Sequence, residues 1–163
     1  MQDNIISKVV ELENCNKDTL IQAIYTPEFW IMINPSKSME AKFTAPNVLY
    51  TKIVDEIINI KIEMEGELVL QDNGEQEGGK GRLIEMNVRN NKDVRELEGR
   101  MRIKAISNNK TKIGVFINSF RLGSDFLNLI GRSAAELTLR TKITEMLRNL
   151  EKYVKTKPLE DLL

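Results

Sequence analysis

The sequence predicts one α+β domain in which an antiparallel sheet of about seven strands wraps around a long C-terminal helix. Three observations support this prediction. The segment from Ser124 to about Lys155 has the spacing of a helix with an apolar face. About six segments in the middle of the chain alternate apolar and polar residues, as half-buried strands do. Two short helical segments separate these strands from a first strand near the N-terminus.

Length and composition limit the class of protein. A chain of 163 residues suits a single domain, 1–163, and we expect residues 156–163 to form a flexible tail. The 24 basic and 24 acidic residues give no net charge and hence no long-range attraction to nucleic acid. No apolar run approaches the roughly 18 residues of a membrane span, and the N-terminus lacks a signal-peptide pattern. We therefore expect a cytoplasmic protein with no nucleic-acid partner and no membrane span.

The chain has a single cysteine, Cys15, and no histidine. An internal disulfide is therefore excluded, as is a metal site built from thiolates or imidazoles. Without an imidazole base nearby, Cys15 is interpreted as a small buried hydrophobic residue and not as a nucleophile. We expect no metal and no cofactor.

The N-terminal third combines a strand with two short helices. Residues 4–12 form a strand candidate that is apolar on both faces. Asn16 is positioned to cap a first helix. Thr26 and Pro27 are typical of the start of a second helix, because proline suits the first helical position. Asn34 and the proline that follows it predict the end of that helix.

The strands of the predicted sheet run from about Met39 to Leu122. Residues 60–70 alternate most clearly, with isoleucine, methionine and leucine on one side and lysine and glutamate on the other. An antiparallel sheet with one solvated face produces this pattern. We expect turns at residues 72–74 and at Gly78 and Gly79.

The long C-terminal helix changes character near Gly131. Its later apolar stripe consists of Leu139, Ile143, Met146, Leu147, Leu150 and Val154. Charged residues, Lys142 among them, are expected on the exposed side. Ala134 and Leu137 point away from the later stripe, as Phe126 and Ile130 do. We therefore expect either a kink at Gly131 or a first half that covers a different surface.

This order of elements resembles the START-related, birch-pollen-allergen-like superfamily (SRPBCC), whose fold is called a helix-grip. The helix pair of residues 16–35 and the segment 123–137 carry the resemblance. Gly123-Ser124 followed by Gly131-Arg132 is most similar to a branch named after a carbon monoxide dehydrogenase subunit, and a polyketide cyclase-like branch is the alternative. The resemblance implies a hydrophobic cavity for lipids, steroids or polyketides. Some members are cyclases or dehydratases, and others are chaperone cofactors.

Candidate binding residues are large, adaptable side chains expected on the concave side of the sheet. Ordinary core packing is the alternative for each of them. Arg82 and Asn118 share the parity of inward-facing neighbours and are candidate polar anchors, with a position at the rim as the alternative. No catalytic residue is predicted. The candidate cavity residues are Tyr25, Phe29, Trp30, Met64, Met86, Met101, Phe126, Ile130 and Leu137.

Three functions follow as hypotheses. The first is binding or transfer of an apolar small molecule or lipid in the cavity. The second is a cyclase or dehydratase acting in the same cavity, which would need Tyr25, Arg82 or a carboxylate because histidine is absent. The third is an assembly or chaperone role with a protein partner. The residues identify neither the ligand nor the oligomeric state.

Overall fold

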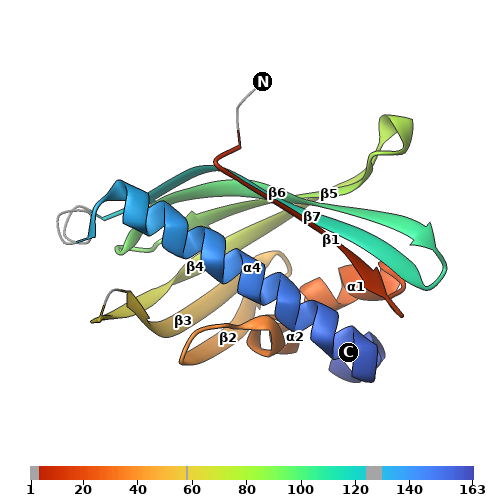
Figure 1. The fold of residues 1–163 in the computed structure, drawn as a ribbon, viewed down its shortest axis with the longest axis horizontal. Coiled ribbons are helices and arrows are strands. Elements are labelled where there is room, and N and C mark those ends of the chain that lie inside the picture. Colours follow the sequence, from red (N-terminus) through yellow and green to blue (C-terminus); the bar gives the residue numbers. More distant parts are fainter. Residues whose placement is uncertain (1–3, 58, 124–129) are drawn as a thin grey trace.

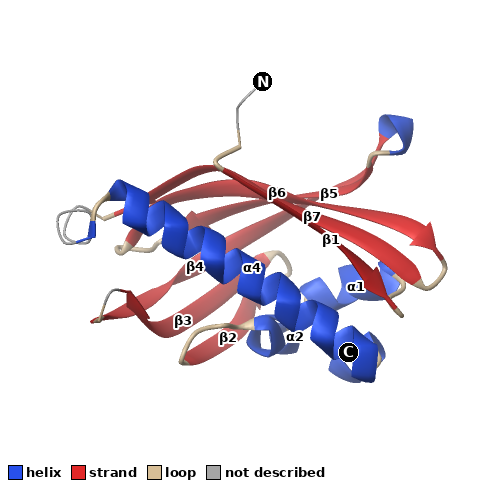
Figure 2. Cartoon of the chain, in the orientation of Figure 1, coloured by secondary structure: helices blue, strands red, loops and turns tan. Residues whose placement is uncertain are grey.

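The computed structural model describes residues 4–57, 59–123 and 130–163. Figure 2 distinguishes the helices from the strands. The elements in chain order are β1 (Ile6–Glu13), α1 (Lys17–Ile24), α2 (Pro27–Ile33), β2 (Ser38–Ala45), β3 (Val48–Ile57), β4 (Ile60–Gln76), η1 (Glu77–Gly79), β5 (Gly81–Arg89), β6 (Val94–Ser107), β7 (Lys110–Leu122), α4 (Arg132–Thr156) and η2 (Leu159–Leu162).

The strands form one antiparallel sheet in the order β1-β7-β6-β5-β4-β3-β2. Strands β2 to β7 form a meander, and β1 pairs with β7, so that Ile6 lies opposite Ile117. Helix α4 crosses one face of the sheet, with α1 and α2 near its C-terminal end (Figure 1). The predicted α+β architecture, with one strand and two short helices before the meander, is confirmed.

Strand β4 is longer than the sequence predicted. The expected turn at residues 72–74 is an irregularity inside the β4–β5 pairing, between Asp72 and Glu75. Gly74 has a φ of 76°, which a glycine adopts without the steric cost that a Cβ would impose. The chain reverses further on, at η1, where Gly78 and Gly79 have positive φ as well. The prediction of a turn at 72–74 was wrong because a bulge and a turn use the same residue types.

The two short helices begin and end where the sequence predicted. The Asn16 side chain accepts a hydrogen bond from the backbone N–H of Thr19 at 3.1 Å, which caps α1. The Thr26 hydroxyl accepts from the N–H of Phe29 at 3.4 Å, and Pro27 opens α2. These caps fix the direction in which α2 presents its aromatic residues to the core.

Helix α4 begins at Arg132, later than the expected start at Ser124. Its N-cap is Gly131, whose φ of 78° and ψ of 162° are not helical. The expected change of direction at Gly131 is therefore a break at the start of the helix. The first part of the predicted helix, residues 124–129, lies outside the described residues. The later stripe is confirmed, since Ile143, Leu147, Leu150 and Val154 are buried.

Polar contacts fix α4 against the N-terminal half of the chain. The Asn149 side-chain amide donates to the carbonyl of Ile33 at 3.0 Å, which satisfies an acceptor at the end of α2. The Asn14 amide donates to the carbonyl of Val154, also at 3.0 Å. Within the part of the chain that the structure describes, no helix has the length and apolar character that a membrane crossing requires.

The last residues differ from the flexible tail that was expected. Residues 159–162 form η2, which packs against α1. Leu159 is only 2% exposed and belongs to the main core. Leu159, with the partly buried Leu162 beside it, thus holds the end of the chain against the core. The short sequence around them has no periodicity that would have predicted this contact.

Candidate functional site

A cavity of about 290 Å³ lies between the concave face of the sheet and α4. Helix α2 contributes Phe29, Trp30 and Ile33 to its wall, and α4 contributes a stripe that includes Leu139, Ile143 and Met146. The strands from β2 to β7 supply most of the remainder, together with the loop at residues 34–36 and Asn91, and the wall is almost entirely apolar. Because α4 is a straight rod and the sheet curves away from it, side chains of ordinary size do not fill the space between them.

Trp30 forms one part of the wall and is held in a fixed orientation. The residue is 6% exposed, and its indole N–H donates to the carbonyl of Ile24 at 2.8 Å. The ring of Phe29 packs against it edge to face, with centroids 5.5 Å apart and planes at 87°. The polar atom of the indole is thus satisfied within the protein, and the rest of the ring offers apolar surface to the cavity.

Methionines are concentrated in the wall. Five of the chain's seven methionines line the cavity, and they come from four strands and from α4. Unbranched thioether side chains adjust their shape to irregular apolar surfaces at little cost. A wall rich in methionine can therefore adapt to apolar ligands of irregular shape, which a wall of rigid side chains could not do. The five are Met39, Met64, Met86, Met101 and Met146.

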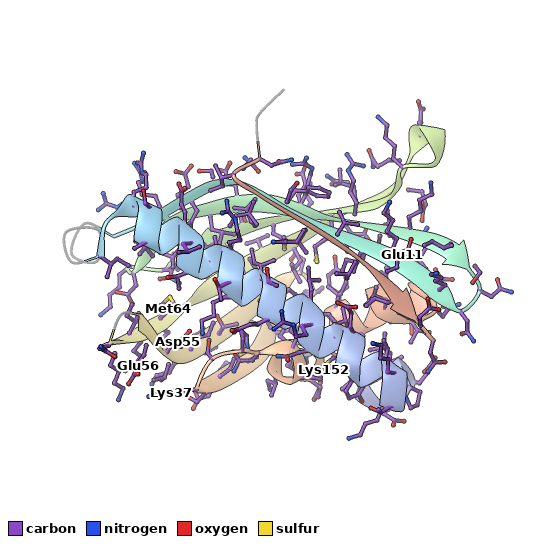
Figure 3. The ribbon with its side chains drawn as sticks, in the orientation of Figure 1. Glu11, Lys37, Asp55, Glu56, Met64 and Lys152 are labelled. Carbon is purple, nitrogen blue, oxygen red and sulfur yellow. The ribbon has the colours of Figure 1, made fainter. Side chains whose placement is uncertain are left out.

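A charged pair interrupts the apolar wall on the side of β3. Asp55 of β3, labelled in Figure 3, is 7% exposed. Its Oδ2 lies 3.0 Å from Nζ of Lys142 on α4. The hydroxyl of Ser36 also donates to Oδ2 at 3.0 Å, and the N–H of Glu56 donates to Oδ1 at 2.8 Å. All three side chains, Ser36, Asp55 and Lys142, line the cavity. We call them the Asp55 cluster.

The Asp55 cluster was not predicted from the sequence. Lys142 was expected on the exposed side of the helix, and that prediction was wrong. A signal was present: positions 139, 142 and 146 have the i, i+3, i+7 spacing of a single helix face, so Lys142 lies within the apolar stripe. Asp55 likewise interrupts a run of isoleucine and valine in β3. Two residues of opposite charge, each within an apolar segment, indicate that the charged side chains can pair with each other.

The structure places five of the predicted cavity residues in the wall: Phe29, Trp30, Met64, Met86 and Met101. Ile130 packs behind the wall, against a small cluster around Val94, Leu122 and Ala135. Leu137 is 60% exposed, so its prediction was wrong. That residue lies on the outer side of α4, because helical spacing turns it away from Leu139, Ile143 and Met146, which face the cavity. Phe126 lies outside the described residues.

Tyr25 lies outside the cavity as well. Its ring packs against Phe43 with centroids 6.3 Å apart. Its hydroxyl is buried, with no hydrogen-bond partner among the described residues. Burial, together with the charge of Asp72, raises the pKa of the Tyr25 hydroxyl. Its position outside the cavity argues against the part that the enzyme hypothesis gave to Tyr25.

The two predicted polar anchors also point elsewhere. Arg82 is paired with Asp72, at 3.0 Å from Nε to Oδ1 and 2.7 Å from Nη2 to Oδ2. This contact raises the pKa of Arg82 and lowers that of Asp72. Asn118 lies at an irregularity in the β6–β7 pairing, where Gly99 pairs with Ile117 and Glu98 with Ser119. An extra residue at that point changes the parity, and Asn118 lines a polar hollow formed with residues such as Gln71 and Glu85.

Comparison with known proteins adds to this description. No model of a protein family matches the sequence, and no curated protein matches it. Solved structures do match. A START superfamily protein from Mycobacterium smegmatis shares 15% identity with a TM-score of 0.66, over 92% of this chain and 96% of that one. The Zhui aromatase/cyclase from Streptomyces sp. R1128 shares 11% identity with a TM-score of 0.67, over 92% of each chain.

A STAR-related lipid transfer protein from Xanthomonas axonopodis is also similar, with 10% identity and a TM-score of 0.66 over 96% of this chain and 90% of that one. At these identities the likeness shows the fold. The chain has a START-like helix-grip fold, as its resemblance to that superfamily predicted. Similar structures include a lipid transfer protein and a cyclase, which is consistent with either ligand binding or cyclisation. The branch suggested by Gly123-Ser124 stays a prediction.

Proposed function

We propose that this protein binds a hydrophobic small molecule or lipid in the cavity between the sheet and α4. The observation that carries the proposal is the cavity itself, which has about 290 Å³ of space behind an apolar, methionine-rich wall. Ligand pockets in proteins begin at about this size and share this character. The similar structures, among them a lipid transfer protein, support the same function by analogy of fold alone.

An empty cavity of this size is costly to maintain. Side chains that line unfilled space lose the dispersion contacts that close packing would give them. Apolar cavities also exclude water, because water finds no hydrogen-bond partners in them. An apolar molecule of suitable shape would recover much of the lost dispersion energy. The cost of the empty state therefore favours occupation by a ligand.

Binding accounts for the wall better than catalysis does. Asp55 is the carboxylate among the described lining residues, and Lys142, Ser36 and a backbone N–H already engage it. A general base must be able to take a proton from its substrate, and an engaged carboxylate is a weak one. The two charges in the wall offset each other, and the rest of the wall is almost entirely apolar, which suits binding of an apolar ligand.

Native mass spectrometry of the purified protein, followed by extraction and identification of any bound molecule, tests this function. We expect an added mass that disappears on denaturation. The variant Met64→Trp should reduce the bound fraction, because the larger ring fills part of the cavity. Leu137→Trp is the matched control, since it adds the same ring at an exposed position of α4 and should leave the bound fraction unchanged. Protein that carries no added mass and takes up no lipid, sterol or polycyclic aromatic compound would refute the proposal.

A further inference from the structure

The Asp55 cluster has hydrogen-bonding capacity that the protein does not use. The ammonium group of Lys142 has three N–H donors, and among the described residues it is paired with Asp55 Oδ2 alone. The Asp55 carboxylate accepts from Lys142, Ser36 and the N–H of Glu56, which leaves one of its four acceptor positions. Both a donor and an acceptor are therefore available to a further polar atom at this point.

The cluster belongs to the cavity wall and is not isolated from it. Lys142 lies between Leu139 and Ile143 in the sequence and on the same helix face as Met146, and all of these residues line the cavity. Its side chain is 25% exposed, and that of Asp55 is 9% exposed. Lys142 thus reaches solvent in part, while Asp55 is buried behind it. A ligand with its apolar part inside would place a polar end here.

The charges around the cluster offset one another. Asp55 and Lys142 carry opposite charges, and the neighbouring exposed pair of Lys37 and Glu56 does too, at 2.8 Å. An anionic ligand group that approached Lys142 would also approach the Asp55 carboxylate and be repelled by it. A cationic ligand group that approached Asp55 would likewise be repelled by the Lys142 ammonium. An uncharged oxygen avoids both costs and still uses the unused donor.

From this geometry we infer that the ligand is amphipathic, with an apolar body in the cavity and an uncharged hydroxyl or carbonyl oxygen bound at Lys142 and Asp55. The inference rests on the proposed function and names its ligand class. A hydroxyl group fits best, because it accepts a hydrogen bond from Lys142 and donates one to Asp55. The pair thereby acts as a specificity determinant and also joins α4 to β3.

Three probes with one apolar body test the inference: naphthalene, 2-naphthol and 2-naphthoate. Isothermal titration calorimetry at neutral pH gives the dissociation constant of each. We expect 2-naphthol to bind about tenfold or more tightly than naphthalene, because a hydrogen bond to a charged group in a desolvated site contributes that much. The carboxylate of 2-naphthoate should bind more weakly than the alcohol. The protein is the full chain throughout.

The double variant Asp55→Asn/Lys142→Met removes both charges together, so neither is left unpaired in the wall. It should lose most of the preference for 2-naphthol, measured as the ratio of the dissociation constants of naphthalene and 2-naphthol. Lys152→Met is the matched control, because Lys152 is exposed on the same helix (Figure 3) and should leave the preference unchanged.

The outcomes separate this inference from the proposed function. Equal affinity for all three probes would overturn the inference and leave the binding function in place. If 2-naphthoate bound most tightly of the three, the inference that the polar end of the ligand is uncharged would be wrong. A preference for 2-naphthol that survives in the double variant would place the polar contact elsewhere and likewise overturn the inference. Failure of every probe to bind would count against both the inference and the proposed function.

Discussion

Lys142 and Asp55 form an ion pair, 3.0 Å between Nζ and Oδ2, within the otherwise apolar wall of the cavity. Helix α4 packs against β1, at one edge of the sheet. The ion pair joins the same helix to β3, near the opposite edge. One charged contact therefore combines a structural role with a position at the proposed ligand site.

The stability of this pair is measured by a double-mutant cycle. Asp55→Asn alone leaves the Lys142 ammonium without its charged partner beside apolar side chains, and we expect a loss of about 1–3 kcal/mol in the free energy of unfolding. Lys142→Met alone leaves a buried carboxylate and should cost a similar amount. The double variant Asp55→Asn/Lys142→Met should be more stable than the sum of the single losses predicts. Denaturant melts that show simple additivity would mean that the two side chains do not interact.

The cavity also predicts which core truncations are tolerated. Leu147 is buried but lines the cavity, so part of its side chain already lacks neighbouring atoms. Leu20 is 0% exposed and packs in the filled part of the core. We expect Leu147→Ala to reduce the free energy of unfolding by about 2–3 kcal/mol and Leu20→Ala by about 3–5 kcal/mol. Chemical denaturation that reverses this order would contradict the position of the cavity.

Cys15 should be an unreactive thiol in the folded protein. The residue is 1% exposed, and burial raises the pKa of its thiol from 9.0 to about 11. The thiolate is the form that reacts, so labelling by Ellman's reagent at pH 8 should require unfolding. Rapid labelling of the native protein would contradict this burial.

The same shift has a consequence for stability at alkaline pH. Because the folded pKa lies above the unfolded value, the folded state holds the proton more tightly. The resulting stabilisation is complete below pH 9 and is lost as the pH rises towards about 11. Cys15→Ala should lack this part of the pH dependence, which parallel melts of the two proteins between pH 8 and 11 would show. Parallel curves over the whole range would contradict the shift.

Arg82 should hold the Asp72 carboxyl in its ionised form to lower pH. The bidentate contact lowers the pKa of Asp72, so the pair stabilises the fold above the ordinary aspartate range and loses this contribution as the pH falls. In Arg82→Met, the pKa of Asp72 should rise, as followed by carbon-detected NMR titration of its carboxyl. Lys104→Met, at an exposed position near the end of β6, is the control. An unchanged Asp72 titration in Arg82→Met would show that the contact is absent in solution.

The architecture could be predicted because its signals are local. Alternation in β4 identified a sheet with one solvated face, and the caps at Asn16 and Thr26 located both short helices. Part of the cavity wall followed too, because Met64 and Trp30 lie at inward positions of regular elements. These inferences needed only the periodicity of one segment at a time.

The errors arose where the period is interrupted or where two distant segments meet. The irregularity at Asn118 adds one residue to β7 and reverses the side on which the following residues lie, which a parity argument does not detect. Leu137 belongs to the continuous helix α4 and lies opposite its inward stripe, on the exposed side, so it does not share a surface with residues before Gly131. The pairing of Asp55 with Lys142 joins residues 87 positions apart, and their contact depends on how far α4 lies from β3. Neither the propensities of single residues nor their spacing in the sequence determines the distance between α4 and β3.

The most direct test of the cavity as a ligand site uses Trp30, the chain's only tryptophan. Its ring lines the cavity and its indole N–H is already bonded to Ile24, so a ligand would change the surroundings of the ring without displacing it. Titration with 2-naphthol would mask the signal, so the ligands are a fatty alcohol and a sterol, which do not fluoresce. We expect a saturable shift in tryptophan emission together with a rise in melting temperature. Emission and melting temperature that both stay constant at saturating ligand would contradict the account.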